Sequence, residues 1–356
     1  MFDFYPINNK PFNENIFFSR QGFFRKVSYF RKFRKFFIRW LYVKIKLRNS
    51  KNIDLILNEH KKILWIQLVD SALGDSLMDL SSRALLKNKR VDFLTNEKLA
   101  KIYQEDEFFD HIFTNPVNCN HNYDLIIVTR YRKEELQSLS KEILSTPHVY
   151  LHGYYEVDFY NRIYFSFFRM NQLLSQENSS NYIYDNARPY LPITKQDKQK
   201  INSYNLSNDF IVMGVGGEDD RRTFTRWNEV VNCIFLEGLY KTIILIGESN
   251  SRETAKDILN SYPENVIDLT NKLSFNESAE VINRGRAFIC CDGGLLHAAN
   301  AVSTPVVALF YQIDPRTRLV KANASHHLSS KKNINNIHTS LIINKIKLLS
   351  NSVISD

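Results

Sequence analysis

The sequence predicts an α/β protein with two parallel-sheet domains and a basic N-terminal arm. Short apolar runs of strand length alternate with helical patterns, an arrangement that implies parallel sheets. A polar segment at 175–208, which contains Pro189 and Pro192, divides these runs into two sets. The chain of 356 residues also exceeds the size that one hydrophobic core usually organises. We expect an arm at 1–60, a first domain at 61–188, a second domain at 189–340 and a C-terminal tail at 341–356.

The arm carries the positive charge. The formal net charge of the chain is +9, but residues 1–51 hold thirteen Lys or Arg against Asp3 and Glu14 and alone carry +11. At about 100° per residue, the helical period, the run 23–41 separates into two faces, with Lys26 and Arg34 as exceptions. The basic face holds Arg25, Arg31, Lys32, Lys35 and Arg39, and the apolar face holds Val27, Phe30, Phe33, Phe36, Phe37, Trp40 and Leu41.

Such a helix is typical of the membrane interface, where basic residues meet anionic lipid and aromatic rings lie at the headgroup level. Two alternatives stay open, a helix packed on the protein's own surface and a nucleic-acid contact.

The rest of the chain argues against other classes of protein. Its four cysteines lack metal-ligand spacing, no apolar run reaches membrane-span length, and the N-terminus lacks the order of a signal peptide. We therefore expect a reducing, cytoplasmic setting.

The predicted strands are apolar runs too short for helices. They lie at 63–69, 91–94 and 123–128 in the first set, and at 210–215, 242–246, 287–291 and 306–310 in the second. The region 150–168 is dense in Tyr and Phe without clean periodicity, so its secondary structure stays open.

The loop at 70–75 follows the first predicted strand. Gly74 permits a tight turn, and Asp75 stands at the start of the helix that follows. A carboxylate there acts as a general base when it lies within hydrogen-bonding reach of a substrate hydroxyl. Spacing alone leaves a second interpretation open, in which Asp75 only caps its helix.

A second loop follows the strand 210–215. It supplies flexible backbone and then cations, a combination that can wrap a diphosphate because the planar donor fork of arginine grips phosphate oxygens. The residues are Gly214, Gly216, Gly217, Arg221, Arg222 and Arg226. The glycines fail as a dinucleotide fingerprint because Asp219 occupies the third position. Glu218, Asp219 and Asp220 fit a solvated turn better than a metal site.

A third loop, C-D-G-G-L-L-H, lies between the strand 287–291 and a helix of small residues. Asp292, Gly293, Gly294 and His297 come at the carboxyl end of the strand and in the first turn of the helix. Backbone N–H groups and the helix dipole favour a phosphate at such a turn. Asp292 as an ordinary N-cap and His297 as a packing histidine form the alternative interpretation.

Together the three loops resemble glycosyltransferase family 9, the lipopolysaccharide heptosyltransferases. The family pattern S-x-x-G-D stands here as S-A-L-G-D at 71–75, and the first eight positions of D-x-G-x-x-H-x-A-A stand as D-G-G-L-L-H-A-A at 292–299. The stretch T-P-V-V-A-L-F-Y-Q-I-D-P at 304–315 is similar to the family's T-P-x-V-A-L-F-G-P-T-D-P. The resemblance covers roughly residues 61 to 320.

The resemblance implies a GT-B fold, with two Rossmann-like domains facing across a cleft, and an inverting, metal-independent transfer. The acceptor binds mainly to the first domain and the nucleotide-sugar to the second. Asp75 is then the catalytic base, and Ser71 and Gly74 belong to the acceptor-side loop. The family places a Lys just before a Trp-Pro pair, which assigns Arg226 to the diphosphate, with Arg221 and Arg222 as second choices. The other implied donor-binding residues are Gly216, Gly217, Glu248, Asp292, Gly293, Gly294 and His297.

The implied donor is ADP-heptose, with no cofactor or metal, and the implied acceptor is a lipid-linked lipopolysaccharide or lipooligosaccharide core in a bacterium. The protein would lie on the inner face of the inner membrane, held by residues 1–51, and bind no nucleic acid. The family's Pro after G-D is missing, and Tyr311 stands where the family has Gly. These departures leave open another nucleotide-sugar for outer-core or capsule synthesis. A non-catalytic, membrane-bound binding module of the same fold is the further alternative.

Overall fold

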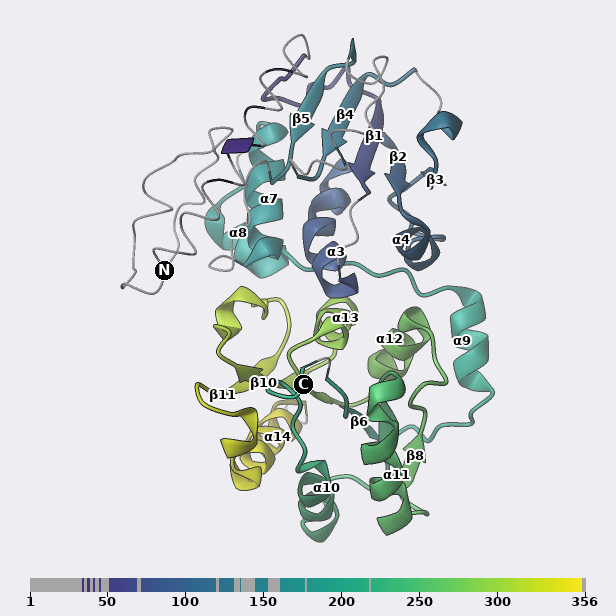
Figure 1. Ribbon diagram of the computed structural model, residues 1–356, viewed down its shortest axis with the longest axis vertical. Helices are drawn as coiled ribbons and strands as arrows, with labels where there is room; N and C mark the ends of the chain where they lie inside the picture. Colours follow the sequence, from purple (N-terminus) through teal and green to yellow (C-terminus); the bar gives the residue numbers. More distant parts are fainter. Residues whose placement is uncertain are drawn as a thin grey trace. The chain divides into compact units, whose positions relative to one another are not determined.

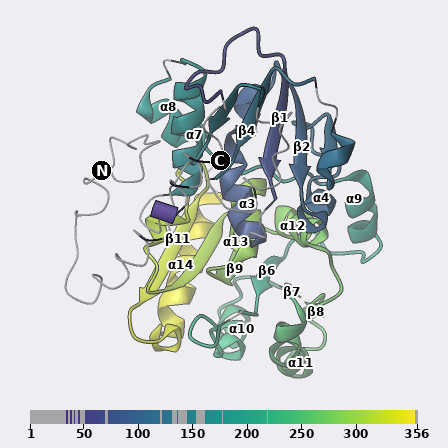
Figure 2. The same ribbon diagram turned by 45° about the horizontal axis from the view of Figure 1, so that its top comes forward.

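The computed structural model describes residues 34, 37, 38, 41, 45, 51–68, 72–119, 122–130, 135, 145–152, 161–176, 178–217 and 219–353. Its internal contacts divide the chain into two compact units (Figures 1 and 2). The first unit comprises Met1–Asp70, Ser82–Val157 and Phe165–Ile183, and the second comprises Ser71–Ser81, Asp158–Tyr164 and Tyr184–Asp356. Two short segments from the N-terminal half therefore belong to the second unit.

The first unit is built on a parallel sheet with strand order β3-β2-β1-β4-β5. The strands are β1 (Lys62–Gln67), β2 (Arg90–Thr95), β3 (His111–Phe113), β4 (Leu125–Val128) and β5 (His148–Tyr150). Residues 63–67 of the central β1 are all buried, as expected of a parallel strand covered on both faces. The strand order reverses between β1 and β4, which is the position where open α/β sheets bind ligands.

The helices associated with this unit are α4 (Glu97–Ile102), most of α7 (Arg162–Leu173) and the first part of α8 (Ser180–Asn186), with short 3-10 turns η1 (Ser81–Leu86) and η2 (Pro116–Asn118). A buried ion pair joins Arg83 to Asp106, and the Arg83 guanidinium also faces the rings of Tyr103, Phe108 and Phe109. A buried charge needs such a partner, so this pair is a structural feature of the first unit.

The second unit is built on a six-stranded sheet with order β11-β10-β9-β6-β7-β8, in which all pairs are parallel. Its strands are β6 (Ile211–Gly214), β7 (Ile243–Ile246), β8 (Val266–Asp268), β9 (Phe288–Cys291), β10 (Val306–Tyr311) and β11 (Ser325–Ser330). The order reverses between β6 and β9, so the binding position of this sheet lies at their carboxyl ends.

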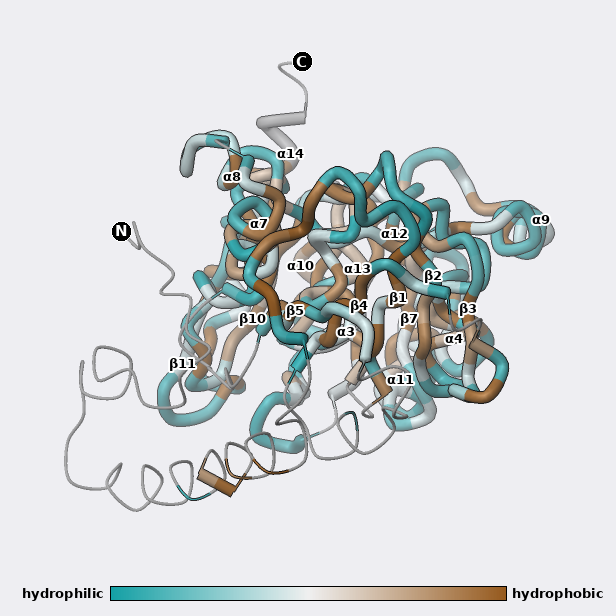
Figure 3. Tube along the Cα trace, turned by 90° about the horizontal axis from the view of Figure 1, so that it is seen from above, coloured by the Kyte–Doolittle hydropathy of each residue, from teal (hydrophilic) through white to brown (hydrophobic). Residues whose placement is uncertain are grey.

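Helices cover both faces of this sheet. One face packs on α10 (Trp227–Leu236), α11 (Arg252–Ser261) and α14 (Thr339–Val353), and the other on α9 (Lys195–Asn202), α12 (Phe275–Arg284) and α13 (Gly294–Val302). The remaining elements are α3 (Leu73–Asp79) and the 3-10 turns η3 (Ser249–Ser251), η4 (Pro315–Thr317) and η5 (Ile334–Asn336). Helix α9 lies in the polar segment at 175–208, and its trace is mostly hydrophilic in Figure 3.

The seven predicted strands are confirmed, as β1, β2, β4, β6, β7, β9 and β10. Four of the strands in the described part of the chain were not predicted. Three of them, β3, β5 and β8, have only three residues each, and β11 is a polar edge strand, S-H-H-L-S-S. Edge strands expose one side to solvent and lose the apolar signal.

The expected tail at 341–356 contains most of α14, which buries Ile342, Ile343, Ile346 and Leu349 in the core.

The predicted membrane helix at 23–41 lies almost entirely outside the described residues. Of this arm the structure describes Arg34, Phe37, Ile38, Leu41 and Ile45, which are helical. The four apolar side chains among them are 42 to 63% exposed. Among the described residues, no helix combines the length and the apolar character needed to cross a bilayer.

Candidate functional site

The predicted donor residues converge on the reversal point of the second sheet. Gly216 and Gly217 follow β6, Glu248 follows β7, and Asp292 follows β9. These strands are neighbours in the order β9-β6-β7, and parallel strands bring their carboxyl ends to one edge. The sequence-predicted loops therefore lie together.

The glycines after β6 permit close packing of that loop. A Cβ at Gly216 would lie 2.1 Å from Ser251 Oγ, and one at Gly217 would lie 2.4 Å from Thr223 Oγ1. Asn250 Nδ2 donates to the carbonyl of Gly217 at 2.6 Å, which joins the β6 loop to the β7 loop. Glu248 is exposed at the start of η3.

Asp292 is buried between two arginines. Its Oδ1 lies 3.6 Å from Arg318 Nε and its Oδ2 lies 3.9 Å from Arg222 Nη1. Burial raises the pKa of the Asp292 carboxyl, and the two guanidinium groups oppose this rise. The N-cap of α13 is Gly293, which makes no side-chain capping bond, so Asp292 is not the N-cap residue.

Gly293 and Gly294 differ in what surrounds them. A Cβ at Gly293 would meet no protein atom within 4 Å, and the backbone there is extended. A Cβ at Gly294 would make an ordinary contact with Phe275 at 3.5 Å. The space beside Gly293 lies next to Asp292 and the first turn of α13, where a ligand can approach the backbone closely.

His297 is 3% exposed, and its Nδ1 is buried without a hydrogen-bond partner among the described residues. Burial, with a contribution from Arg318, lowers its pKa to about 3. The imidazole is therefore neutral at physiological pH. A packing histidine normally satisfies its ring nitrogens, and Nδ1 of His297 has no such partner among the described residues.

Helix α3 packs against α13 within the second unit. A Cβ at Gly74 would lie 2.5 Å from His297 Cδ2 and 3.2 Å from the Cα of Gly294. Only glycine allows this approach. The G-D pair and the D-G-G-L-L-H turn, which are more than 200 residues apart in the chain, therefore occupy one place.

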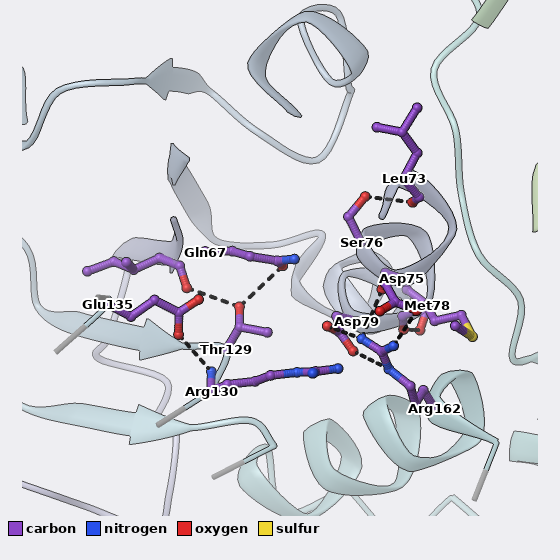
Figure 4. Close-up of polar contacts among 12 residues, drawn as sticks. Gln67, Leu73, Asp75, Ser76, Met78, Asp79, Thr129, Arg130, Glu135 and Arg162 are labelled. Atoms are coloured by element: carbon purple, nitrogen blue, oxygen red, sulfur yellow. Dashed lines mark hydrogen bonds and ion pairs between the residues drawn. The ribbon is translucent and has the colours of Figure 1, made fainter. Parts of the chain in front are cut away.

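Asp75 is held by an arginine that sequence reasoning missed. Arg162 Nη1 lies 2.6 Å from Asp75 Oδ1, and the same guanidinium binds Asp79 (Figure 4). The N-cap of α3 is Ala72, and it makes no side-chain capping bond. Asp75 lies in the first turn without being the cap, and its side chain is 39% exposed.

The predicted arginines divide into two groups. Arg226, the first choice for the diphosphate, forms a forked pair with Glu229, with Nε to Oε1 at 2.8 Å. Arg221 pairs with Asp219 at 2.7 Å. Arg222 is the predicted arginine whose guanidinium faces Asp292.

Three residues of the site carried no sequence signal. Arg162, Asp79 and Arg318 lie outside the motifs and become visible only through their contacts. Ser71 and Glu218, which the sequence singled out, lie outside the described residues. Among the described residues, no group of three or more His, Cys, Asp or Glu side chains is arranged to hold a metal ion.

A family model described as glycosyltransferase family 9 (heptosyltransferase) matches residues 167–346, just over half of the chain. The chain belongs to glycosyltransferase family 9. No curated protein matches the chain significantly. The family resemblance inferred from the three loops is confirmed.

Solved structures agree with this family 9 fold. A glycosyl transferase family 9 protein from Veillonella parvula is 15% identical, with a TM-score of 0.69 over 85% of this chain and 100% of that one. The E. coli ADP-heptose lps heptosyltransferase II is 14% identical, with a TM-score of 0.62 over 82% and 99%. TibC of enterotoxigenic E. coli, described as an iron-containing dodecameric glycosyltransferase, is 13% identical, with a TM-score of 0.51 over 85% and 78%. The predicted α/β, GT-B class is confirmed by these likenesses.

Proposed function

We propose that this family 9 glycosyltransferase moves a heptose from ADP-heptose onto a lipid-linked lipopolysaccharide or lipooligosaccharide core, with inversion at the anomeric carbon. The observation that carries the proposal is the packing of α3 on α13. It places Asp75 in the same compact unit as Asp292 and His297. The proposal is also supported by family membership and by the ADP-heptose enzyme among the similar structures.

In the proposed mechanism Asp75 takes the proton of the acceptor hydroxyl. The acceptor oxygen then forms a bond to the anomeric carbon as the bond from that carbon to the diphosphate breaks, and the nucleoside diphosphate leaves with the electron pair. Preorganised donors aimed at this growing charge lower the barrier. Arg222 and Arg318 flank Asp292 and are the cations that we assign to the diphosphate.

His297 has a different role in this scheme. A neutral imidazole donates through one ring N–H and carries no charge. We assign it to a hydrogen bond with the donor, while the arginines supply the charge. Arg226 stays a weaker candidate because Glu229 already holds its guanidinium.

The test is a screen of nucleotide-sugars against truncated core acceptors, with the added mass as the readout. We expect the mass of one heptose with ADP-heptose. Asp75→Asn should lower turnover by about 10²- to 10⁴-fold, the usual contribution of a general base. A different added mass would identify another nucleotide-sugar, the alternative that Tyr311 in place of the family's Gly favours.

Asp75→Asn also separates an enzyme from a binding module of the same fold. A non-catalytic module would bind the acceptor lipid yet transfer no sugar from any donor, and Asp75→Asn would match the parent in every assay.

Metal independence is part of the proposal, because arginines face the predicted diphosphate position. Turnover should therefore survive treatment with a chelator, and a loss that iron restores would contradict this part.

We propose that the arm holds the enzyme on the inner face of the inner membrane. The charge of +11 in residues 1–51 and the exposed apolar side chains of Phe37, Ile38, Leu41 and Ile45 support this location. Each basic residue near an anionic leaflet contributes about 1 kcal/mol.

The membrane proposal is tested on the full chain with anionic and neutral vesicles. Reversing Arg31, Lys32 and Lys35 to Glu should release the protein from anionic vesicles, while turnover on a short soluble acceptor stays largely intact. Reversal of the exposed Lys256 of α11 is the control. Undiminished binding of the triple variant to anionic vesicles would contradict the proposal. Binding of the parent to nucleic acid rather than to vesicles would favour the interpretation of the arm as a nucleic-acid contact.

A further inference from the structure

Arg162 is the first residue of α7, and its guanidinium contacts two carboxylates of α3 (Figure 4). Nε donates to Asp79 Oδ1 at 2.9 Å, and Nη2 donates to the second oxygen of the same carboxylate. Nη1 lies 2.6 Å from Asp75 Oδ1, and Nη2 also reaches the backbone carbonyl of Asp75 at 3.3 Å. One arginine thus joins the predicted base to a second aspartate one turn further along the helix.

The Arg162–Asp79 ion pair is more buried than the Arg162–Asp75 ion pair. The side chain of Asp79 is 1% exposed and that of Arg162 is 14% exposed, whereas that of Asp75 is 39% exposed. A buried charge without a partner is strongly destabilising, so Arg162 and Asp79 fix each other in place. The forked geometry then leaves Nη1 directed at Asp75, because the guanidinium is planar and rigid.

The first turn of α7 is itself fixed to the donor side of the unit. Asn161 Oδ1 accepts from the backbone of Ile163 at 3.0 Å, and its Nδ2 donates to the carbonyls of Arg316 and Leu319 at 3.1 and 2.8 Å. Tyr164 Oη accepts from the backbone N–H of Lys321 at 2.7 Å. The segment that carries Arg162 is therefore bound to the same loop that supplies Arg318.

We propose that Arg162 is the positioning residue of the base, which holds the Asp75 carboxylate ionised and in one orientation toward the acceptor hydroxyl. The inference rests on the proposed role of Asp75. A carboxylate accepts a proton only while it is ionised, and a guanidinium within 4 Å favours that form. A fixed orientation matters as well, since displacement of a reacting group by about 1 Å can cost about 10²-fold in rate.

Several other charged or titratable groups face Asp75. Asp79 lies on its own helix, Arg162 on α7, Asp292 at the end of β9 and His297 on α13. Asp292 and Asp75 repel each other, and Arg162 is a cation in direct contact with Asp75. Its removal should therefore weaken the ionised form of Asp75.

The direct test follows the Asp75 carboxyl by carbon-13 NMR of aspartate-labelled protein, with Asp75→Asn to assign the signal. In Arg162→Gln, Asp75 should titrate at least about one pH unit higher than in the parent. Arg162→Lys keeps the charge but loses the fork, so Asp75 should titrate closer to its midpoint in the parent. This measurement needs no substrate.

The kinetic test compares the same variants in the transfer assay. Arg162→Gln should lower kcat by about 10- to 100-fold, with KM for the donor nearly unchanged, and should move the acid limb of the pH profile to higher pH. Arg162→Lys should restore the acid limb but only part of kcat. Asp79→Asn, which loosens Arg162, should give an intermediate result.

Arg169→Gln is the matched control. Arg169 is a second buried arginine of α7, about two turns on, and it donates to the Tyr150 carbonyl at 3.3 Å and faces Asp54. Its replacement should lower stability without moving the pH profile. An unchanged Asp75 titration in Arg162→Gln, or a raised donor KM with unchanged kcat, would overturn the proposal. If the parent transfers no sugar at all, the proposed function fails, while the NMR titration still decides whether Arg162 controls Asp75.

Discussion

His297 is the residue whose chemistry the structure changes most. As a sequence feature it stood for a phosphate ligand or a packing histidine. Its burial and the lowered pKa, about 3, make it a neutral imidazole with an unpartnered buried Nδ1 among the described residues. In the proposed donor site the positive charge therefore comes from Arg222 and Arg318, which face Asp292.

The lowered pKa of His297 predicts a specific dependence of stability on pH. The unfolded chain binds a proton near pH 6.5 and the folded chain only near pH 3, so the contribution is complete above pH 6.5 and is lost as the pH falls. The loss amounts to at most about 1.4 kcal/mol per pH unit for one proton. Urea unfolding between pH 7 and pH 4 should show a shallower slope in His297→Gln than in the parent. The exposed His338→Gln serves as control, and equal slopes in parent and His297→Gln would contradict the prediction.

Gly74 and Gly293 make a matched pair of glycine tests. At Gly74 an added methyl would lie 2.5 Å from the His297 ring, so Gly74→Ala should lower both stability and turnover by separating α3 from α13. At Gly293 an added methyl meets no protein atom within 4 Å. Gly293→Ala should leave the free energy of unfolding within about 0.5 kcal/mol of the parent and weaken ADP binding, measured by calorimetry. Unimpaired ADP binding by Gly293→Ala would place the ligand elsewhere.

Sequence reasoning reached the residues that belong to strand-end motifs, and their roles stay predictions. Asp75, Asp292 and His297 are local features of loops after buried strands, and such loops meet at one sheet edge. Arg162 and Arg318 have no such signal, because Arg162 lies 87 positions from Asp75 and Arg318 lies 26 positions from Asp292 in the chain. Arg226 was preferred as the diphosphate ligand for its place beside Trp227. In the structure its guanidinium pairs with Glu229, three residues later.

Among the elements, α3 departs most from its place in the sequence. It directly follows β1 of the first sheet, yet its contacts assign it to the second unit. Gly74 permits this assignment, because it allows α13 to approach closely. Sequence patterns predicted the helix but not its partner, since periodicity reports that a face is buried and not what covers it.

The caps of two helices test how far this organisation depends on α7. Asn161 caps α7 and also holds two carbonyls of the 316–319 loop, whereas Ser274 caps α12 within a local capping box. Ser274→Ala should cost about 1 kcal/mol. Asn161→Ala should cost about 1 to 3 kcal/mol more, because two part-buried hydrogen bonds to backbone carbonyls are lost as well. It should also lower kcat, because Arg162 follows directly. Urea unfolding and the transfer assay measure both effects, and equal costs in the two variants would contradict the argument.

In the whole molecule, the two sheets share one strand order, 3-2-1-4-5, and the second adds a sixth strand. Alternating strands and helices were enough to predict this class, because parallel connections leave few arrangements. The exact division into units was beyond sequence reasoning, since the segments at 71–81 and 158–164 change unit through long-range packing.

This division predicts where a ligand protects the backbone. A nucleoside diphosphate at 100 times its Kd stabilises what it binds by about 2.7 kcal/mol. In hydrogen exchange, ADP should therefore protect the donor loops at 214–223, 247–251 and 291–298, and also 72–80, because α3 packs on α13. Strands β1 to β5 should change little, since they belong to the other unit. Arg222→Gln should weaken all of this protection together, because Arg222 faces Asp292. Protection of β1 to β5 equal to that of the donor loops would contradict this division of the chain. An absence of protection at 72–80 would show that α3 does not act as part of the unit that binds ADP.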